Sequence, residues 1–166
     1  MNKTLWKLCV VSAAVTAVFG CAKEERPDGL PDLFPCILTF TQEGKPLAGA
    51  TVEVVGVDSS QWSAGGMTDG AGRVELVTYG KFKGVRAGRH KVVVNKHESE
   101  ASTSDVEMEA GIVLSGQPKI FSVVEQQHTT SETTPWEVEI SSGGNNDQTF
   151  ECGKAVREPF AGFVGL

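Results

Sequence analysis

The residues of this chain that could catalyse a reaction or bind a metal ion are few and scattered. The three histidines, His90, His97 and His128, lack the spacing of metal ligands, and we expect them to lie on the surface. Asp69 stands in a Thr-Asp-Gly-Ala-Gly segment with too few side-chain oxygens for calcium, so it is expected to cap a turn. Ser115 does not stand in a Gly-x-Ser-x-Gly motif. The sequence therefore predicts no catalytic residue, no metal site and no cofactor.

A cysteine follows an apolar segment near the start of the chain. Two lysines precede the uncharged residues 8–19, which is the layout of a secretory signal and is shorter than the roughly 20 apolar residues of a transmembrane helix. The segment ends in Val-Phe-Gly20-Cys21, which resembles the lipobox of bacterial lipoproteins. The resemblance implies cleavage between Gly20 and Cys21 and acylation of the Cys21 thiol, with residues 1–20 as a lipoprotein signal peptide. A plain secretory signal with a chance cysteine is the alternative.

A lipid anchor at Cys21 implies a place in the bacterial cell envelope. Each buried methylene contributes about 0.8 kcal/mol, so two or more acyl chains hold a protein stably at a membrane. Ala22 follows the cysteine where an aspartate would favour retention at the inner membrane, so the resemblance favours the outer membrane, facing the periplasm or the surface. The charged and proline-rich residues 21–33 are then expected to be a tether between lipid and domain.

The charge of the chain argues against a nucleic-acid partner. The sequence has 15 basic and 21 acidic residues, and cleavage before Cys21 would remove two lysines, so 13 against 21 leaves a net charge of −8. Nucleic acids and anionic surfaces need a concentrated basic patch. The envelope proteins and glycans therefore remain as expected partners.

Two further cysteines, Cys36 and Cys152, stand near the two ends of the expected domain. No histidine stands near either of them in the sequence, so a reactive thiol is not favoured. In an oxidising envelope such a pair is expected to form a disulfide. Two buried free thiols are the alternative.

Short segments of alternating apolar and polar residues predict an all-β domain over residues 34–153. Near the end, for example, Trp136, Val138 and Ile140 should face inward while Glu137 and Glu139 face outward. Residues 97–134 are a long connection whose apolar cluster at residues 120–124 is expected to dock as a turn or brief helix, and residues 154–166 form a C-terminal tail. The expected strands cover residues 36–41, 50–57, both sides of the turn at 69–72, 88–96, and a closing hairpin from residue 136 that turns at Gly143-Gly144; the first two are separated by a turn at Glu43-Gly44.

Four blocks of the sequence resemble, in order, a known type of domain. The blocks GKPLAGATVEVV, GGMTDGAGRVELVTYG, AGRHKVVVNK and TTPWEVEISSGGNN are similar to segments of carboxypeptidase regulatory-like, transthyretin-like domains, and most of all to small lipoproteins of this type known from planctomycetes. The resemblance covers roughly residues 34–153. It implies an antiparallel, prealbumin-like β-sandwich of about seven strands without a general catalytic motif.

Related adhesin domains sometimes form an isopeptide between lysine and asparagine. Lys45, Asn145 and Asn146 lie in expected turns, where all three should be solvated. Burial is what lowers the pKa of a lysine and makes it nucleophilic, so this bond is not expected.

Aromatic and basic residues supply the candidate binding sites. Trp62 lies in a polar Ser/Gly stretch and could stack on a sugar or anchor a partner, or it could fold onto the domain. One loop concentrates positive charge and is either a contact for an acidic partner or a solvated loop balancing acidic neighbours. Its candidate residues are Tyr79, Lys81, Phe82, Lys83 and Arg86.

These observations favour a lipid-anchored, non-enzymatic β-sandwich module with a structural role or a role in binding envelope proteins or glycans. A carbohydrate-binding accessory lipoprotein is the first alternative. A transthyretin-like hydrolase is less favoured, because such enzymes use a histidine-rich dimer site and a C-terminal Tyr-Arg-Gly-Ser-type motif that this chain lacks.

Overall fold

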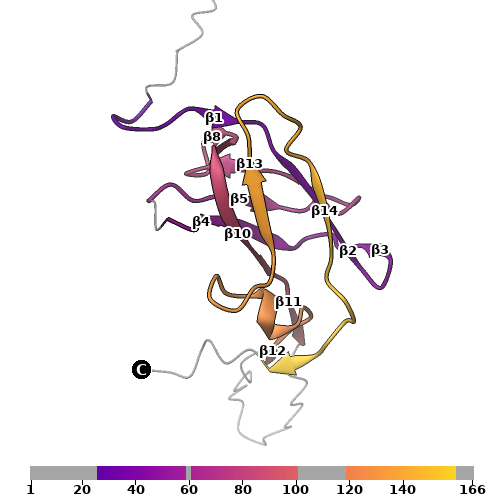
Figure 1. Cartoon of the computed structure of the whole chain (residues 1–166). Coiled ribbons are helices and arrows are strands. Elements are labelled where there is room, and N and C mark those ends of the chain that lie inside the picture. The colour runs from indigo at the N-terminus through magenta and orange to yellow at the C-terminus, as the bar shows by residue number, and fades with distance from the viewer. Residues whose placement is uncertain (1–25, 59–60, 101–118, 160–166) are drawn as a thin grey trace, which may run out of the picture.

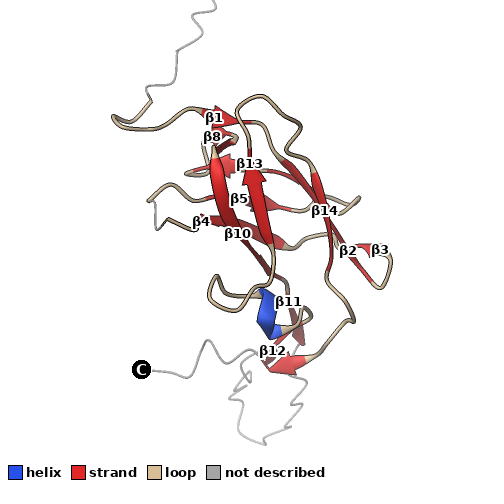
Figure 2. Cartoon of the chain, in the orientation of Figure 1, coloured by secondary structure: helices blue, strands red, loops and turns tan. Residues whose placement is uncertain are grey.

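The computed structural model describes residues 26–58, 61–100 and 119–159. Within these ranges almost all regular structure is β-strand, and one short 3₁₀ helix, η1 (Gln126–His128), is present (Figure 2). No helix in the described ranges is long and apolar enough to cross a membrane. The expected signal peptide, Cys21 and the end of the tail lie outside the described residues.

Most strands belong to two sheets that share one core (Figure 1). The larger sheet is antiparallel. Its longest strand, β10 (Gly88–Asn95), pairs with β4 (Thr51–Gly56) from His90 opposite Gly56 to Asn95 opposite Thr51. In order across the sheet, its strands are β13 (Glu137–Ile140), β10 (Gly88–Asn95), β4 (Thr51–Gly56), β5 (Ala64–Met67), β7 (Val77–Thr78) and β8 (Phe82–Lys83).

The second sheet is built around β2 (Ile37–Gln42). One edge of β2 pairs in parallel with β14 (Gln148–Glu151), and the other pairs antiparallel with β3 (Lys45–Pro46) and with β6 (Arg73–Glu75). Glu43 and Gly44 both have positive φ, as a tight hairpin turn requires, so the predicted turn between β2 and β3 is confirmed.

Two small sheets complete the described strands. Strand β1 (Leu33–Phe34) pairs with β9 (Val85–Arg86). Strand β11 (His97–Glu100) pairs with β12 (Lys119–Ser122), which also pairs with β15 (Glu158–Pro159).

The core lies between the inward faces of the two large sheets, so the all-β, sandwich-like expectation is confirmed. Strand β4 alternates exposed Thr51 and Glu53 with buried Val52 and Val54, because successive side chains point to opposite faces of a strand. Phe40 of β2 packs against the rings of Trp136 and Phe150, with centroid distances of 6.2 and 5.5 Å. The fully buried side chains include Leu38, Phe40, Val52, Val54, Leu76, Val85, Val92, Val94, Val124, Val138 and Ile140.

The predicted closing hairpin is wrong. Strand β13 pairs with β10 in the larger sheet, whereas β14 crosses to the second sheet and pairs in parallel with β2. The crossing is secured by the side chain of Asn146, which is 4% exposed and not solvated as expected. Its Nδ2 donates to the carbonyl oxygens of Pro35 (3.1 Å) and Ser141 (3.2 Å), and its Oδ1 accepts from the backbone N–H of Ser141 (2.9 Å). A polar segment with two glycines matches a hairpin turn in sequence, but the buried amide ties it to the other sheet.

The described parts of the long connection and of the tail, residues 97–100, 119–134 and 154–159, include three short strands that the sequence does not predict. The expected turn or brief helix at residues 120–124 is instead the end of β12, followed by Val123 and Val124, which are buried in the core. The tail contributes β15, where the Arg157 guanidinium lies 4.3 Å from the centre of the Phe121 ring and its Nη2 donates to Glu100 at 2.7 Å.

Candidate functional site

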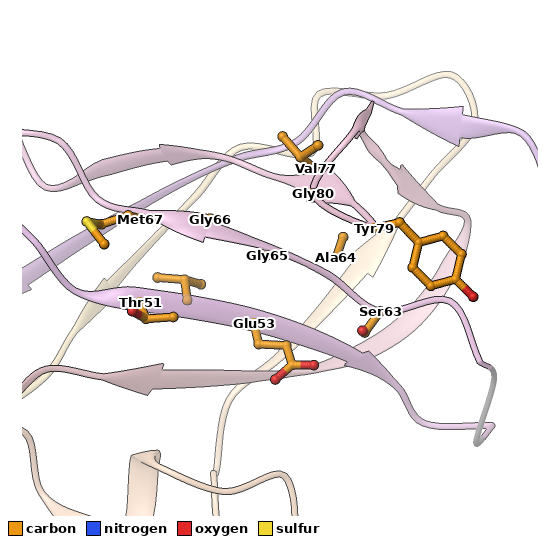
Figure 3. A pocket seen from close by; sticks show the side chains of 11 residues that line it. Thr51, Glu53, Ser63, Ala64, Gly65, Gly66, Met67, Val77, Tyr79 and Gly80 are labelled. Carbon is orange, nitrogen blue, oxygen red and sulfur yellow. The ribbon is translucent and has the colours of Figure 1, made fainter. Parts of the chain in front are cut away.

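A shallow groove crosses the outer face of the larger sheet, over β4, β5 and β7 (Figure 3). The register places Thr51 opposite Met67, and it places Gly65 between Glu53 and Val77. Figure 3 shows Met67 at one end of the groove and Tyr79 at the other. The groove encloses about 390 Å³ and is lined by Thr51, Val52, Glu53, Ser63, Ala64, Gly65, Gly66, Met67, Val77, Tyr79 and Gly80.

Two glycines of β5 line the groove. Gly65 lies opposite Glu53 on the outer face of the sheet, whereas Gly66 lies opposite the buried Val52. A Cβ on Gly65 would lie 2.7 Å from the carbonyl oxygen of Val52, and a Cβ on Gly66 would lie 2.6 Å from Cγ2 of Val74. No real Cβ tolerates such contacts without a shift of the neighbouring atoms. The strand therefore presents bare backbone between Glu53 and Val77, and the groove stays open.

Tyr79 closes one end of the groove from a tight turn. The N–H of Lys81 donates to the carbonyl of Thr78 at 3.2 Å, and the two central residues, Tyr79 and Gly80, have φ of 55° and 64°. Positive φ at both central positions is the signature of the type I′ hairpin turn between β7 and β8. The conformation suits Gly80 but is unfavourable for a bulky residue such as Tyr79, whose side chain is nevertheless 56% exposed. A strained, exposed aromatic residue points to a binding role.

The two aromatic residues singled out from the sequence lie together. Trp62 is half-buried just before β5, and its ring meets that of Tyr79 edge to face, with centroids 5.1 Å apart. The half-buried indole therefore packs on the domain, as one of the two alternatives states, and it also supports the ring of Tyr79 at the end of the groove. Edge-to-face pairs of this kind stabilise aromatic surfaces beyond the area they bury.

The basic loop is largely neutralised by its own neighbours. The Nζ of Lys83 donates to both oxygens of Glu75 at 3.2 Å, and Arg86 pairs with Asp58. The Nζ of Lys81 lies 5.5 Å from the centre of the Phe82 ring. These contacts favour the solvated loop over a contact for an acidic partner. Of the six candidate binding residues, only Tyr79 lines the groove, and Trp62 packs against the Tyr79 ring from outside the lining. The other four, Lys81, Phe82, Lys83 and Arg86, do not line the groove.

The expectation that all three histidines lie on the surface is wrong for two of them. His97 is exposed, but His90 is fully buried and His128 is 5% exposed. The Nδ1 of His90 lies 3.0 Å from the carbonyl oxygen of Gly88, and burial lowers the pKa of its imidazole. Both buried histidines point into the fold, so they cannot meet a substrate in the groove.

The predicted disulfide between Cys36 and Cys152 is wrong, because both cysteines are buried free thiols. Cys36 lies just before β2 and its Sγ donates to the carbonyl oxygen of Asn146 at 3.3 Å, whereas the N–H of Cys152 donates to the carbonyl of Thr41 at the far end of β2. At about 3.3 Å of rise per residue the two cysteines are separated by roughly 17–20 Å. Disulfides need Cα atoms within about 7 Å. Burial raises the pKa of the Cys36 thiol to about 11 and that of Cys152 to about 12, so neither is a nucleophile near neutral pH.

Asp69 caps a turn, as the sequence predicts. Its Oδ1 accepts the backbone N–H groups of Ala71 and Arg73, each at 2.9 Å, and these hydrogen bonds lower the pKa of the carboxyl group. Across the ranges that the structure describes, no group of three or more His, Cys, Asp or Glu residues is arranged to hold a metal ion.

Sequence reasoning missed the residues that complete the groove, namely Thr51, Glu53, Ser63 and Met67. A signal was present, because Thr51 and Glu53 are the outward positions of an alternating strand. What the sequence lacks is the register that brings Met67, which is 67% exposed, and Tyr79 to the same face. Comparison with models of protein families, with curated proteins and with solved structures finds no match to this chain.

Proposed function

We propose that this chain is a lipid-anchored, non-catalytic module of the bacterial cell envelope that binds glycans at the groove over β4, β5 and β7. The observation that carries the proposal is the Trp62–Tyr79 ring pair at the end of an open groove lined by hydroxyl and carboxylate side chains. Sugar rings present both C–H faces, which pack on aromatic rings, and hydroxyl groups, which bond to polar side chains. Aromatic residues with a few placed polar groups are the usual composition of such sites.

The fold part of the proposal is a prealbumin-like β-sandwich. Its support is the order of the four sequence blocks, together with two sheets packed around one core. In such a module the sheets serve to present surface residues, and the chemistry comes from the surface rather than from the core.

The anchoring part rests on the residues before and at Cys21. Its test is mass spectrometry of the N-terminal peptide from bacterial membranes, with Cys21→Ser and, as a matched control, Cys9→Ser. The native chain and Cys9→Ser should carry acyl chains at residue 21 and sediment with membranes. Cys21→Ser should lose both the acyl chains and the sedimentation. An unmodified Cys21 in the native chain would refute the anchor.

The binding part is tested by retention of the purified protein on immobilised envelope glycans. The native chain should be retained, Trp62→Ala should elute with the void volume, and Val57→Ala should be retained. Val57 is a suitable control because it is 43% exposed and does not line the groove. If all three proteins passed through the column without retention, glycan binding would be refuted. If all three were retained equally, Trp62 would not contribute to the binding. Cross-linking of a protein partner through the groove, without glycan retention, would replace it with protein docking.

A further inference from the structure

We propose that the groove selects glycans that carry a protonated amino group, with the carboxylate of Glu53 as the residue that binds the amine. The inference rests on the proposed glycan binding and adds the chemical class of the ligand.

Glu53 gives the groove its charge. It is exposed on β4, and no lysine or arginine stands among the residues that line the groove. In the part of the chain that the structure describes, Glu53 makes no ion pair, and Lys91 of the neighbouring strand β10 pairs instead with Glu137 at 2.9 Å. A charge-assisted hydrogen bond between an ammonium group and a carboxylate is roughly twice as strong as a neutral hydrogen bond.

The aromatic end of the groove favours the same ligand. The exposed ring of Tyr79 presents a negative π face, which attracts cations, and its pairing with Trp62 holds it in place. An amino sugar offers both features together, since its ring C–H groups can pack on Tyr79 while its ammonium group pairs with a carboxylate.

The strands under the groove disfavour an extended peptide as the occupant. Peptides often bind by adding a strand to a free sheet edge. Here β5 pairs with β4 along its length and with β7 at Ala64 and Gly65, so β5 offers no free edge at these two residues. At Gly65 the groove instead offers backbone without a side chain, against which a sugar ring can lie. A volume of about 390 Å³ falls at the lower end of the roughly 300–1,000 Å³ of small-molecule sites.

The test compares two matched oligosaccharides that differ only in the amino group. The full chain, purified in detergent, is titrated by isothermal calorimetry with glucosamine tetramer and with N-acetylglucosamine tetramer at pH 6 and physiological salt. Acetylation removes the charge and keeps the rings. The glucosamine tetramer should bind at least about tenfold more tightly, since charged hydrogen bonds are about twice as strong as neutral ones.

Two carboxylate variants separate the site from overall charge. Glu53→Gln should reduce the preference for the amine to within about twofold. Glu139→Gln makes the same charge change at an exposed position of β13 that does not line the groove, and it should leave the preference intact. Both positions are exposed, so both variants should unfold at the temperature of the native chain.

The outcomes are distinguishable from failure of the proposed function. Equal affinity for the two tetramers, or a loss shared equally by both variants, would overturn amine selection and leave glycan binding in place. The absence of binding by glucosamine tetramer would also overturn amine selection, and retention on envelope glycans decides the proposed function separately.

Discussion

The imidazole of His128 lies flat against the indole of Trp136, with ring centroids 3.9 Å apart and ring planes 8° apart. The histidine is buried at the end of η1, and its Nδ1 has no hydrogen-bond partner within the described structure. Burial lowers the pKa of His128, although Glu125 acts in the opposite direction. The stacked ring is therefore the neutral imidazole of His128, and the stack joins η1 to the core rings of Trp136, Phe40 and Phe150.

The fold should lose stability as the pH falls below the ordinary histidine pKa of about 6.5. Burial lowers the pKa of both His128 and His90 in the folded chain, so below this pH the unfolded chain binds more protons and is stabilised relative to the folded chain. Near His90, Arg86 also lowers the pKa, while the Gly88 carbonyl and Asp58 raise it. The stability contribution is fully present above about pH 6.5 and decreases toward the folded-state pKa values. Urea unfolding between pH 8 and pH 5 measures it.

The variant His128→Phe measures how much of this pH dependence of stability is due to His128. His128→Phe keeps a flat ring on Trp136 but cannot be protonated, so its stability should fall less steeply with pH. If His128→Phe and the native chain had the same slope, His128 would not be the titrating group.

Asn146 should be among the residues whose truncation destabilises the fold most. Asn146→Ala removes both donors and the acceptor of a buried amide and leaves the carbonyl of Pro35 and the N–H of Ser141 without partners. A loss of about 2–4 kcal/mol in the free energy of unfolding is expected. The neighbouring Asn145 is exposed and accepts one hydrogen bond from Asp147, so Asn145→Ala should cost less than about 1 kcal/mol. Equal effects of the two variants would contradict the crossing described above.

Cys36 and Cys152 should resist alkylation in the folded protein and react only after denaturation. Both thiols are buried and have raised pKa values, so neither accessibility nor the thiolate form favours reaction. Peptide mass spectrometry after treatment with iodoacetamide, with and without urea, measures this. Detection of two peptides linked through the sulfurs of Cys36 and Cys152 in the native protein would show that the disulfide forms and would contradict this prediction.

Tyr79→Asn should weaken binding with little net change in the stability of the fold. Asparagine tolerates positive φ better than tyrosine, and relief of about 1 kcal/mol in the turn should offset the loss of the ring contact with Trp62. The same change removes the exposed ring and leaves the edge of Trp62 without its partner. Thermal unfolding and glycan retention of the same protein measure both effects. A folded variant that is still fully retained on the glycans would show that Tyr79 does not contribute to binding.

The strands of the domain were predictable because alternation is a local property. Val52 and Val54 face the core and Thr51 and Glu53 face outward, as a period of two dictates. The turns at Glu43-Gly44 and Asp69 were equally local, since positive φ and a carboxylate cap depend on residues next to each other in the chain.

Pairings between distant segments were not predictable in this way. The parallel pairing of β14 with β2 depends on Asn146 reaching Pro35 across 111 positions of sequence, and no local pattern encodes it. The expected disulfide fails for the same reason, because two cysteines near the two ends of a domain in sequence need not lie close together in space. Of the groove, the sequence indicates only Tyr79 and the neighbouring Trp62, which packs on its ring. The register of β4, β5 and β7 decides which other residues line the groove.

The most direct test of the account is a ¹H–¹⁵N NMR titration of the chain with oligosaccharides released from the bacterial envelope. Glycan binding at the groove predicts saturable shift changes concentrated at residues 51–53, 63–67 and 77–80, and at the indole N–H of Trp62, with Trp136 unchanged. Shift changes that cluster elsewhere, or none at concentrations where the native chain is retained on the same glycans, would contradict the groove as the binding site.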